Sequence, residues 1–294
     1  MRKTRLWKIS AYAGLLAFLV IAGFLAWQLM KQVPTAGDWK DTLKILSTAE
    51  FKGNLVTVKN VRNFQYDASG TPTVEAYYDK TYDLSKLVKV WYIAEPFNPG
   101  SPFSHTFLSF EFSDGSYLAI TIEARLTKDE QYGITAGLLH TYPLMYIAAD
   151  ERDVIYVRTN INKEEVYVYP LKATPDQGRL LLTDMLNRMN DIAVHPTWYN
   201  AIYANCTSSI AGHVNKIWPG LLPRFDWQVV FTSYADKMAL DRGLLDTTLP
   251  LDQARARFYV TDKAQKIGYV SDFSKQIRQF DQKSAALTNS INKK

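Results

Sequence analysis

A long apolar segment near the N-terminus restricts where this chain can reside. Ile9 to Met30 is a run of 22 residues without a charged side chain. As a helix it spans about 33 Å, enough to cross a hydrocarbon core of about 30 Å. A cleaved signal peptide is the alternative, but its apolar region is shorter, and Pro34-Thr-Ala-Gly is a poor cleavage site. We therefore predict an uncleaved transmembrane anchor over residues 9–30.

Basic residues before this run predict its orientation. Arg2, Lys3, Arg5 and Lys8 precede it, and such residues stay on the cytoplasmic side of a membrane span. Residues 1–8 are therefore expected in the cytoplasm, and the chain after Lys31 on the other side. We expect a single-pass protein of a bacterial-type inner membrane with a periplasmic domain.

The composition fits a folded domain and excludes some partners. Of the 294 residues 47% are apolar, enough for a packed core. The formal net charge is +5, but Lys and Arg are scattered and form no basic stripe, so we expect no nucleic-acid partner. No nucleotide-binding glycine run or metal-spaced His/Cys cluster occurs, and we predict no cofactor and no metal site.

The single cysteine, Cys206, cannot form an internal disulfide in an oxidising compartment. It is either a buried small hydrophobe or a reactive nucleophile. Apolar residues recur after it at helical spacing, at Ile210, Val214 and Ile217. Asn205 is a good N-cap, which places Cys206 at the first helical position. Free backbone N–H groups and the helix dipole favour a thiolate there and can hold an oxyanion.

A thiol nucleophile needs a base, and the chain has four histidines. His213 lies about 10 Å from Cys206 along the predicted helix, too far for a direct hydrogen bond. His195 precedes a proline in a predicted loop, and His140 has no polar companion pattern. We expect these three to be structural, which leaves His105.

His105 opens the clearest β-hairpin of the sequence. Alternating segments at Ser104–Phe112 and Ser116–Leu126 flank Ser113-Asp114-Gly115. A two-residue loop would set the polar face of one strand against the apolar face of the other, which is unfavourable. A three-residue loop with the glycine in the left-handed conformation avoids this conflict.

The three-residue loop also decides which residues face each other. It pairs Leu108 with Ile120 and places Glu123 directly opposite His105. Their Cβ atoms are then about 5 Å apart, so that the carboxylate can hold the imidazole tautomer and stabilise its protonated form. A cross-strand ion pair at the surface is the alternative.

Several motifs together resemble one bacterial family. They are Asn60-Val-Arg-Asn-Phe64, His105–Phe112, Ile122-Glu-Ala-Arg125, Ala149–Val154, Trp198-Tyr-Asn200, Asn205-Cys-Thr207 and Phe273–Arg278. With them most of the exported chain resembles the Lnb N-terminal periplasmic domain, whose name comes from a lipoprotein N-acyltransferase. The resemblance implies a circularly permuted, NlpC-type papain-like fold in which the histidine strand precedes the nucleophile helix.

The resemblance also assigns roles by motif. It implies Cys206 as nucleophile, His105 as base and Glu123 as the residue that orients the base. Other residues of the matched motifs are expected at the substrate or behind the catalytic groups: Arg62, Asn63, Tyr199, Asn200, Asn205 and Thr207. For Arg62 and Asn63, a turn held by their hydrogen bonds is the alternative.

The rest of the chain is arranged around this core. We expect an α+β fold with an antiparallel sheet packed on helices. Its parts are residues 31–98 as the N-terminal part of the domain, 99–235 as the catalytic core, 236–281 as a covering segment and 282–294 as a polar tail. Paired strands are expected at Asp153–Arg158 and Glu165–Tyr169, an amphipathic helix at Pro175–Met189 and a last strand at Phe225–Ser233.

The function expected from these features is covalent acyl chemistry. Cys206 would form a thioester, and a lipoprotein or lipid is the expected substrate of an acyl transfer. If water is the acceptor, the same site is an amidase, peptidase or lipase. A noncatalytic, membrane-tethered binding module is an alternative of another class, and it predicts an unreactive Cys206. The expected partners are membrane lipid and a lipoprotein or peptide substrate.

Overall fold

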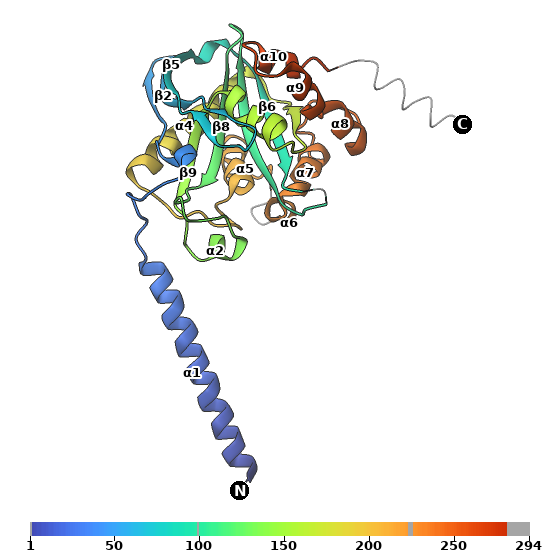
Figure 1. Ribbon diagram of the computed structural model, residues 1–294. Coiled ribbons are helices and arrows are strands. Elements are labelled where there is room, and N and C mark those ends of the chain that lie inside the picture. Colours follow the sequence, from blue (N-terminus) through green and yellow to red (C-terminus); the bar gives the residue numbers. More distant parts are fainter. Residues whose placement is uncertain (1, 99, 223–225, 281–294) are drawn as a thin grey trace, which may run out of the picture.

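The N-terminal apolar run folds into one helix, α1 (Arg2–Met30), which projects from the rest of the chain (Figure 1). The computed structural model describes residues 2–98, 100–222 and 226–280. Within α1 the window Ala11–Gln28 is long and apolar enough to cross a membrane, and 6% of it is buried against the protein. In the described ranges no other helix has this property. The helix therefore coincides with the predicted anchor and fits a single-pass membrane protein.

The main sheet is mixed rather than purely antiparallel. In spatial order its strands are β1 (Thr48–Lys52), β2 (Leu55–Arg62), β9 (Leu144–Ala149), β8 (Tyr117–Ala124), β7 (Ser104–Phe112), β6 (Leu87–Pro96) and β10 (Tyr167–Pro170), while β5 (Tyr77–Asp83) pairs with β2 outside this order. The neighbours are antiparallel except β2 and β9, which are parallel at Arg62 and Ala149. A separate small ladder joins β3 (Gln65–Tyr66) and β4 (Pro72–Val74). Together with the helices, this sheet confirms the α+β class.

The β7–β8 hairpin has the predicted register. Leu108 pairs with Ile120, and Phe110 pairs with Leu118. Gly115 has a φ of 81°, a left-handed conformation that glycine adopts without a Cβ clash. The loop chemistry and the apolar pattern of the two strands therefore suffice to place the start of β7 beside the end of β8.

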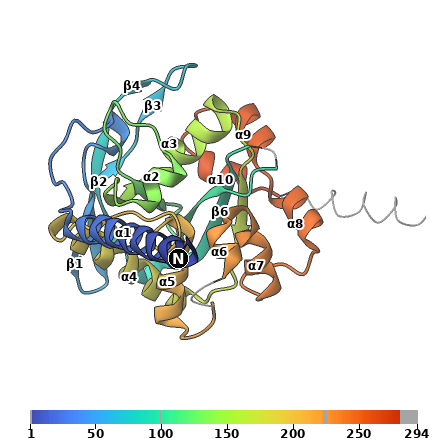
Figure 2. The same ribbon diagram turned by 90° about the horizontal axis from the view of Figure 1, so that it is seen from below.

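Alternate residues of β7 face different helices. Thr106 Oγ1 lies 2.8 Å from Thr207 Oγ1 on α5 (Cys206–Ile217), whereas the guanidinium of Arg158 stands 5.4 Å from the ring centroid of Phe107. Figure 2 shows α4 (Pro175–Val194) and α5 on one side of the sheet, and α3 (Glu151–Tyr156), α9 (Thr261–Ile267) and α10 (Phe273–Ile277) on the other. Because both faces are covered, β7 is buried along almost its whole length.

The helix predicted at Pro175–Met189 is confirmed as α4, which continues to Val194. Its first turn has a capping box in which the Thr174 hydroxyl accepts from the backbone N–H of Gln177. The apolar side chains predicted to face inward are buried: Leu181, Leu182, Met185 and Leu186. This helix packs on β1, β6 and β9.

The strand predicted at Asp153–Arg158 is wrong, because this segment is helical. The carboxylate of Asp150 accepts a hydrogen bond from the backbone N–H of Arg152 at 2.9 Å and starts α3. A π-helical turn, Val157–Ile161, follows directly. The segment predicted to pair with it, Glu165–Tyr169, does contain a strand, β10, but this strand pairs with β6. Six residues are too few to separate helical from strand periodicity, and the cap decides the outcome.

The last strand predicted at Phe225–Ser233 is also wrong over residues 226–233, and Phe225 lies outside the described residues. The carboxylate of Asp226 accepts from the backbone N–H of Gln228 at 2.9 Å, and α6 (Trp227–Val230) begins there. A 3-10 turn, Thr232–Tyr234, follows. The covering segment continues with α7 (Ala235–Asp241), α8 (Leu251–Phe258), α9 and α10.

The remaining short elements are η1 (Asp41–Leu43), η2 (Leu84–Lys86) and α2 (Ile134–Leu138). Figure 1 shows α2 at the end of the domain from which α1 leaves. The polar tail predicted at residues 282–294 lies outside the described residues.

Candidate active site

Cys206 is the first residue of α5, as predicted. Asn205 Oδ1 accepts from the backbone N–H of Ser208 at 2.7 Å, and the Ser208 hydroxyl accepts from the backbone N–H of Asn205 at 2.9 Å. This reciprocal capping box starts the helix at the cysteine. The first N–H groups of a helix have no acceptor within it, so those of Cys206 and Thr207 are available beside the thiol. The thiol thus lies where the helix dipole favours an anion.

The imidazole of His105 is held by two side chains of β8. Its Nε2 lies 2.7 Å from Thr121 Oγ1 and 3.2 Å from Glu123 Oε1. The Thr121 hydroxyl donates to Glu123 Oε1 at 2.8 Å, so its oxygen is free to accept from Nε2–H of His105. The His105 side chain is 9% exposed, which rules out the alternative of an ion pair at the surface.

These contacts distinguish the two ring nitrogens of His105. Nε2 carries its proton towards the Thr121 hydroxyl and the Glu123 carboxylate. Nδ1 is therefore the ring nitrogen left to exchange a proton with a group in the cavity, whose wall includes both His105 and Cys206. A base oriented by a carboxylate behind it has the arrangement of groups that acid–base catalysis needs.

Electrostatics favour the charged forms of all three side chains. Burial alone would lower the pKa of His105, but Glu123 and Cys206 outweigh it and raise the pKa to about 10. Burial would raise the pKa of Glu123, but His105 and then Arg158 lower it to about 2. For Cys206, burial acts against ionisation, yet His105 and the backbone N–H of Thr106 bring the thiol pKa below its ordinary value. A thiolate and an imidazolium are therefore favoured together.

Arg158 adds a positive charge behind Glu123. Its Nη2 lies 3.7 Å from Glu123 Oε1, and its Nε bonds the carboxylate of Glu95. Burial raises the pKa of Glu95 to about 8 in spite of this arginine. Arg158 stands in the π-helical turn after α3 and reaches the site from the face of the sheet opposite α5. The orientation of Glu123 on β8 thus depends also on the helical layer that carries Arg158.

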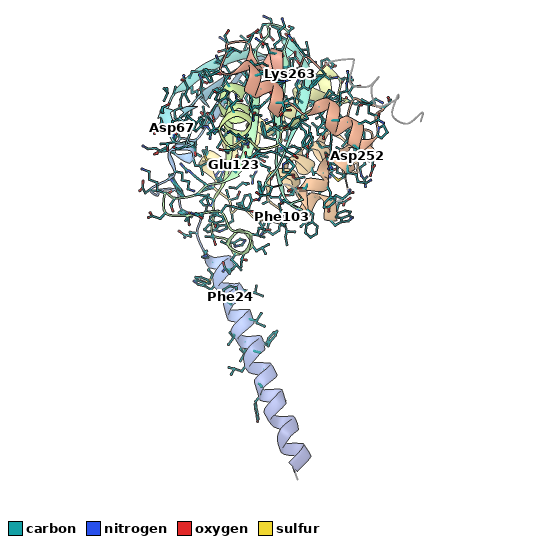
Figure 3. All side chains as sticks on the ribbon, turned by 45° about the vertical axis from the view of Figure 1, so that its right-hand side comes forward. Phe24, Asp67, Phe103, Glu123, Asp252 and Lys263 are labelled. Carbon is teal, nitrogen blue, oxygen red and sulfur yellow. The ribbon has the colours of Figure 1, made fainter. Side chains whose placement is uncertain are left out.

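A cavity of about 640 Å³ gives access to these groups, and its wall includes Cys206, His105 and Glu123. Apolar and aromatic side chains line other parts of it: Leu43, Phe97, Phe103, Tyr132, Ile134 and Val230. Figure 3 labels Glu123 within the body of the domain and Phe103 nearer to α1. Cys206 is 6% exposed, so a reagent reaches the sulfur through this cavity. Its size is typical of sites that bind small molecules.

Arg62 lines the same cavity, but its guanidinium is occupied. Its Nε and Nη2 donate to the carboxylate of Asp153 at 2.8 Å and 3.0 Å, and its Nη1 donates to the carbonyl oxygen of Thr42. Asn63 is not part of the cavity wall, and its Oδ1 accepts from the Tyr269 hydroxyl at 3.4 Å. These side-chain contacts join distant segments of the chain and do not hold a turn, so a role of either residue at the substrate stays a prediction.

The four other predicted residues divide between the cavity and its support. Tyr199 and Asn205 line the cavity, and the Tyr199 hydroxyl lies 3.2 Å from that of Tyr132. Asn200 shapes the turn before α5, because its Oδ1 accepts from the backbone N–H of Ile202 at 2.9 Å. Thr207 points to the sheet, where its hydroxyl meets that of Thr106, and it lies outside the wall of this cavity.

The three histidines expected to be structural have other partners. His213 bonds Tyr146 at 2.8 Å through Nε2 and Asp184 at 2.6 Å through Nδ1. His195 follows the last residue of α4 and contacts Asp191 of that helix. His140 is stacked on Trp198, with ring centroids 5.8 Å apart. None of them lines the cavity that contains Cys206.

Sequence reasoning missed Thr121, Arg158 and Thr106 as parts of the site. The signal for Thr121 was present, because it lies two residues before Glu123 on the same face of a predicted strand. Arg158 carried no such signal, since its segment was predicted as a strand. In the described ranges no group of three or more His, Cys, Asp or Glu side chains is placed to hold a metal ion.

The family comparison covers the part of the chain that carries these elements. Residues 73–233 match the Lnb N-terminal periplasmic domain, and this segment includes β7, β8 and α5 with His105, Glu123 and Cys206. The chain matches no curated protein and no solved structure. Since the matched segment is more than half of the 294 residues, the chain belongs to the Lnb N-terminal periplasmic domain family.

Proposed function

We propose that this protein is a membrane-anchored periplasmic enzyme with Cys206 as nucleophile, His105 as base and Glu123 as the residue that orients the base. The observation that carries the proposal is the contact of Glu123 Oε1 with His105 Nε2 at 3.2 Å, in the wall of a cavity that Cys206 also lines from the capped start of α5. The order of these residues along the chain also supports a permuted NlpC-type papain-like arrangement.

The proposed reaction proceeds through a thioester. The Cys206 thiolate attacks an ester or amide carbonyl carbon, and the carbonyl oxygen becomes an oxyanion next to the N–H groups that begin α5. When the bond to the leaving group breaks, that group takes the proton from His105 Nδ1. An acceptor then gives its proton to His105 and attacks the thioester, which breaks the C–S bond and restores the thiolate.

The proposed reaction class is acyl transfer on a lipoprotein or a membrane lipid. Two observations support it: the family name, which derives from a lipoprotein N-acyltransferase, and α1, which would hold the site close to a membrane. The described part of this chain contains one candidate span, whereas the named acyltransferase has further spans. The proposed location is the inner membrane, with the N-terminus in the cytoplasm.

The test uses the single thiol of the full chain in detergent. The rate of alkylation by iodoacetamide is measured against pH for the wild type, His105→Ala and a control, His195→Ala, which removes an imidazole whose side chain is 77% exposed. We expect the wild-type and control thiols to titrate well below about 8.5, and the His105→Ala thiol to return towards that value.

The opposite result would favour a noncatalytic binding module. In that case alkylation would be slow, the thiol would have an ordinary or raised pKa, and loss of His105 would change neither. If the thiol is activated, product analysis with an amine or with water as acceptor then separates a transferase from a hydrolase.

A further inference from the structure

The end of α1 is bonded to two loops of the periplasmic domain. His140 Nδ1 lies 3.2 Å from the carbonyl oxygen of Gln28, and the Lys31 ammonium donates to the carbonyl oxygen of His140 at 3.0 Å. Trp198 Nε1 donates to the carbonyl oxygen of Lys31 at 3.3 Å. Gln28 is the last residue of the apolar window. The loops that carry His140 and Trp198 therefore lie at the level where a membrane span formed by α1 would end.

Large apolar and tyrosine side chains are exposed on the same loops. We call them the rim, and they are Tyr132, Ile134, Leu138, Leu139, Ile202 and Tyr203, each more than one third exposed. The Tyr203 hydroxyl lies 3.2 Å from His140 Nε2, so a single imidazole links the rim to Gln28. Figure 1 shows α2, which carries part of the rim, beside the exit of α1. A group of exposed side chains of this kind usually marks an interaction surface.

The two segments that form the rim carry no formal charge. Residues 131–149 and 192–215 contain no Asp, Glu, Lys or Arg. Tyrosine side chains favour the headgroup level of a bilayer, where the ring is in an apolar environment and the hydroxyl is hydrated, and aliphatic side chains extend further towards the acyl chains. The composition of the rim therefore matches lipid rather than water or a charged protein partner.

The candidate active-site cavity reaches the rim. Tyr132 and Ile134 belong to both, and Phe103 and Val230 also line the cavity. Figure 3 places Phe103 at the edge of the domain that faces α1, between Glu123 and Phe24. The cavity that contains the thiol thus extends to the surface next to the membrane span.

We infer that the rim rests in the headgroup layer of the bilayer that α1 crosses, and that the cavity takes its acyl substrate from that layer. The inference rests on the proposed function in taking Cys206 as the reacting group. It specifies a substrate whose ester or amide lies at the headgroup level of a lipid or lipid-modified protein, rather than one dissolved in the periplasm.

Photocrosslinking tests the position of the rim without reference to the thiol. Benzoylphenylalanine is placed at Leu138 or Ile202 in the full chain, reconstituted in vesicles of phosphatidylethanolamine and phosphatidylglycerol. The control position is Val88, which is 42% exposed compared with 39% for Leu138. It lies between the pairs Leu87–Phe112 and Lys89–Glu111, at the end of β6 opposite the pair Glu95–His105. We expect lipid adducts from Leu138 and Ile202 and none above background from Val88. Equal yields at all three positions would overturn the inference.

A second measurement tests the opening of the cavity. Vesicles that contain phosphatidylethanolamine with a maleimide on its headgroup present a thiol reagent at the membrane, and iodoacetamide presents one in water. The double variant Leu138→Glu/Ile202→Glu should react about tenfold more slowly than wild type with the lipid maleimide, because two charges disfavour the interface. Its rate with iodoacetamide should be unchanged, and the Val88→Glu control should match wild type with both reagents.

The two proposals fail in different ways. A wild-type thiol that reacts readily with iodoacetamide but not with the lipid maleimide would refute the membrane-facing cavity and leave the proposed function intact. A thiol that reacts slowly with iodoacetamide would count against the proposed function. The lipid adducts from Leu138 and Ile202 would then still show whether the rim lies in the bilayer.

Discussion

Glu123 Oε1 lies 3.2 Å from His105 Nε2 across the β7–β8 hairpin, and the hydroxyl of Thr121 contacts both atoms. The carboxylate therefore acts on the imidazole directly and through a neighbour on its own strand. Since the other ring nitrogen is left for the thiol, the pKa of His105 links Glu123 to the reactivity of Cys206.

Replacing Glu123 by Gln should weaken this link. The charge that raises the pKa of His105 to about 10 would be lost, so the imidazolium should lose its proton at a lower pH. In the wild type the ion pair with the thiolate should persist until the pH rises through about 10. Because the imidazolium lowers the thiol pKa of Cys206, the rate of Cys206 alkylation should rise at a higher pH in Glu123→Gln than in wild type. An unchanged titration of the thiol would show that the carboxylate does not control the base.

The same substitution should change stability within a defined pH range. The folded pKa of Glu123 is depressed from 4.5 to about 2, so its contribution is present above 4.5 and lost as the pH falls through 2. The folded pKa of His105 is raised from 6.5 to about 10, so its contribution is complete below 6.5 and lost as the pH rises through 10. The difference in unfolding free energy between wild type and Glu123→Gln should be largest between pH 4.5 and 6.5.

Thr121→Val tests the hydroxyl that bridges the pair. Valine keeps the shape of the side chain but cannot accept from His105 Nε2 or donate to Glu123. A hydrogen bond contributes about 1 kcal/mol, so the rate of Cys206 alkylation at neutral pH should fall about fivefold. Thr121→Ser retains the hydroxyl and should restore most of the rate. A serine variant as slow as the valine variant would assign the effect to packing.

Arg62→Met tests whether Arg62 supports the fold or binds substrate. It would leave the carboxylate of Asp153 buried without its cation, which typically costs about 3–5 kcal/mol of stability. Chemical unfolding in detergent should show this loss, while the pKa of the Cys206 thiol stays near the wild-type value. The double variant Arg62→Met/Asp153→Leu should recover part of the stability. A stable Arg62→Met protein would remove the argument for a structural role.

Local signals predicted the parts of the candidate site that depend on neighbouring residues. The position of Cys206 follows from an N-cap one residue before it, and the contact between His105 and Glu123 follows from the loop length and the alternation within one hairpin. In both cases the interacting residues are close in the sequence, and local sequence patterns predict such contacts well.

The parts that depend on distant residues were not predictable in the same way. Asp153 is held by Arg62 from a strand 91 positions earlier, and this ion pair helps to place the helical turn that carries Arg158. A short segment with an ambiguous pattern was therefore predicted as a strand. The same holds for residues 226–233, where the cap at Asp226 outweighs the preference of β-branched and aromatic residues for strands.

The burial of a solitary sulfur also affects how the protein tolerates oxidants. Cys206 is the only cysteine of the chain, so a sulfenic acid formed there has no second thiol of its own with which to form a disulfide. Recovery then requires an external reductant small enough, or a partner thiol flexible enough, to enter the cavity that leads to the sulfur. Access through that cavity therefore determines both how fast this thiol is oxidised and whether it can be reduced again.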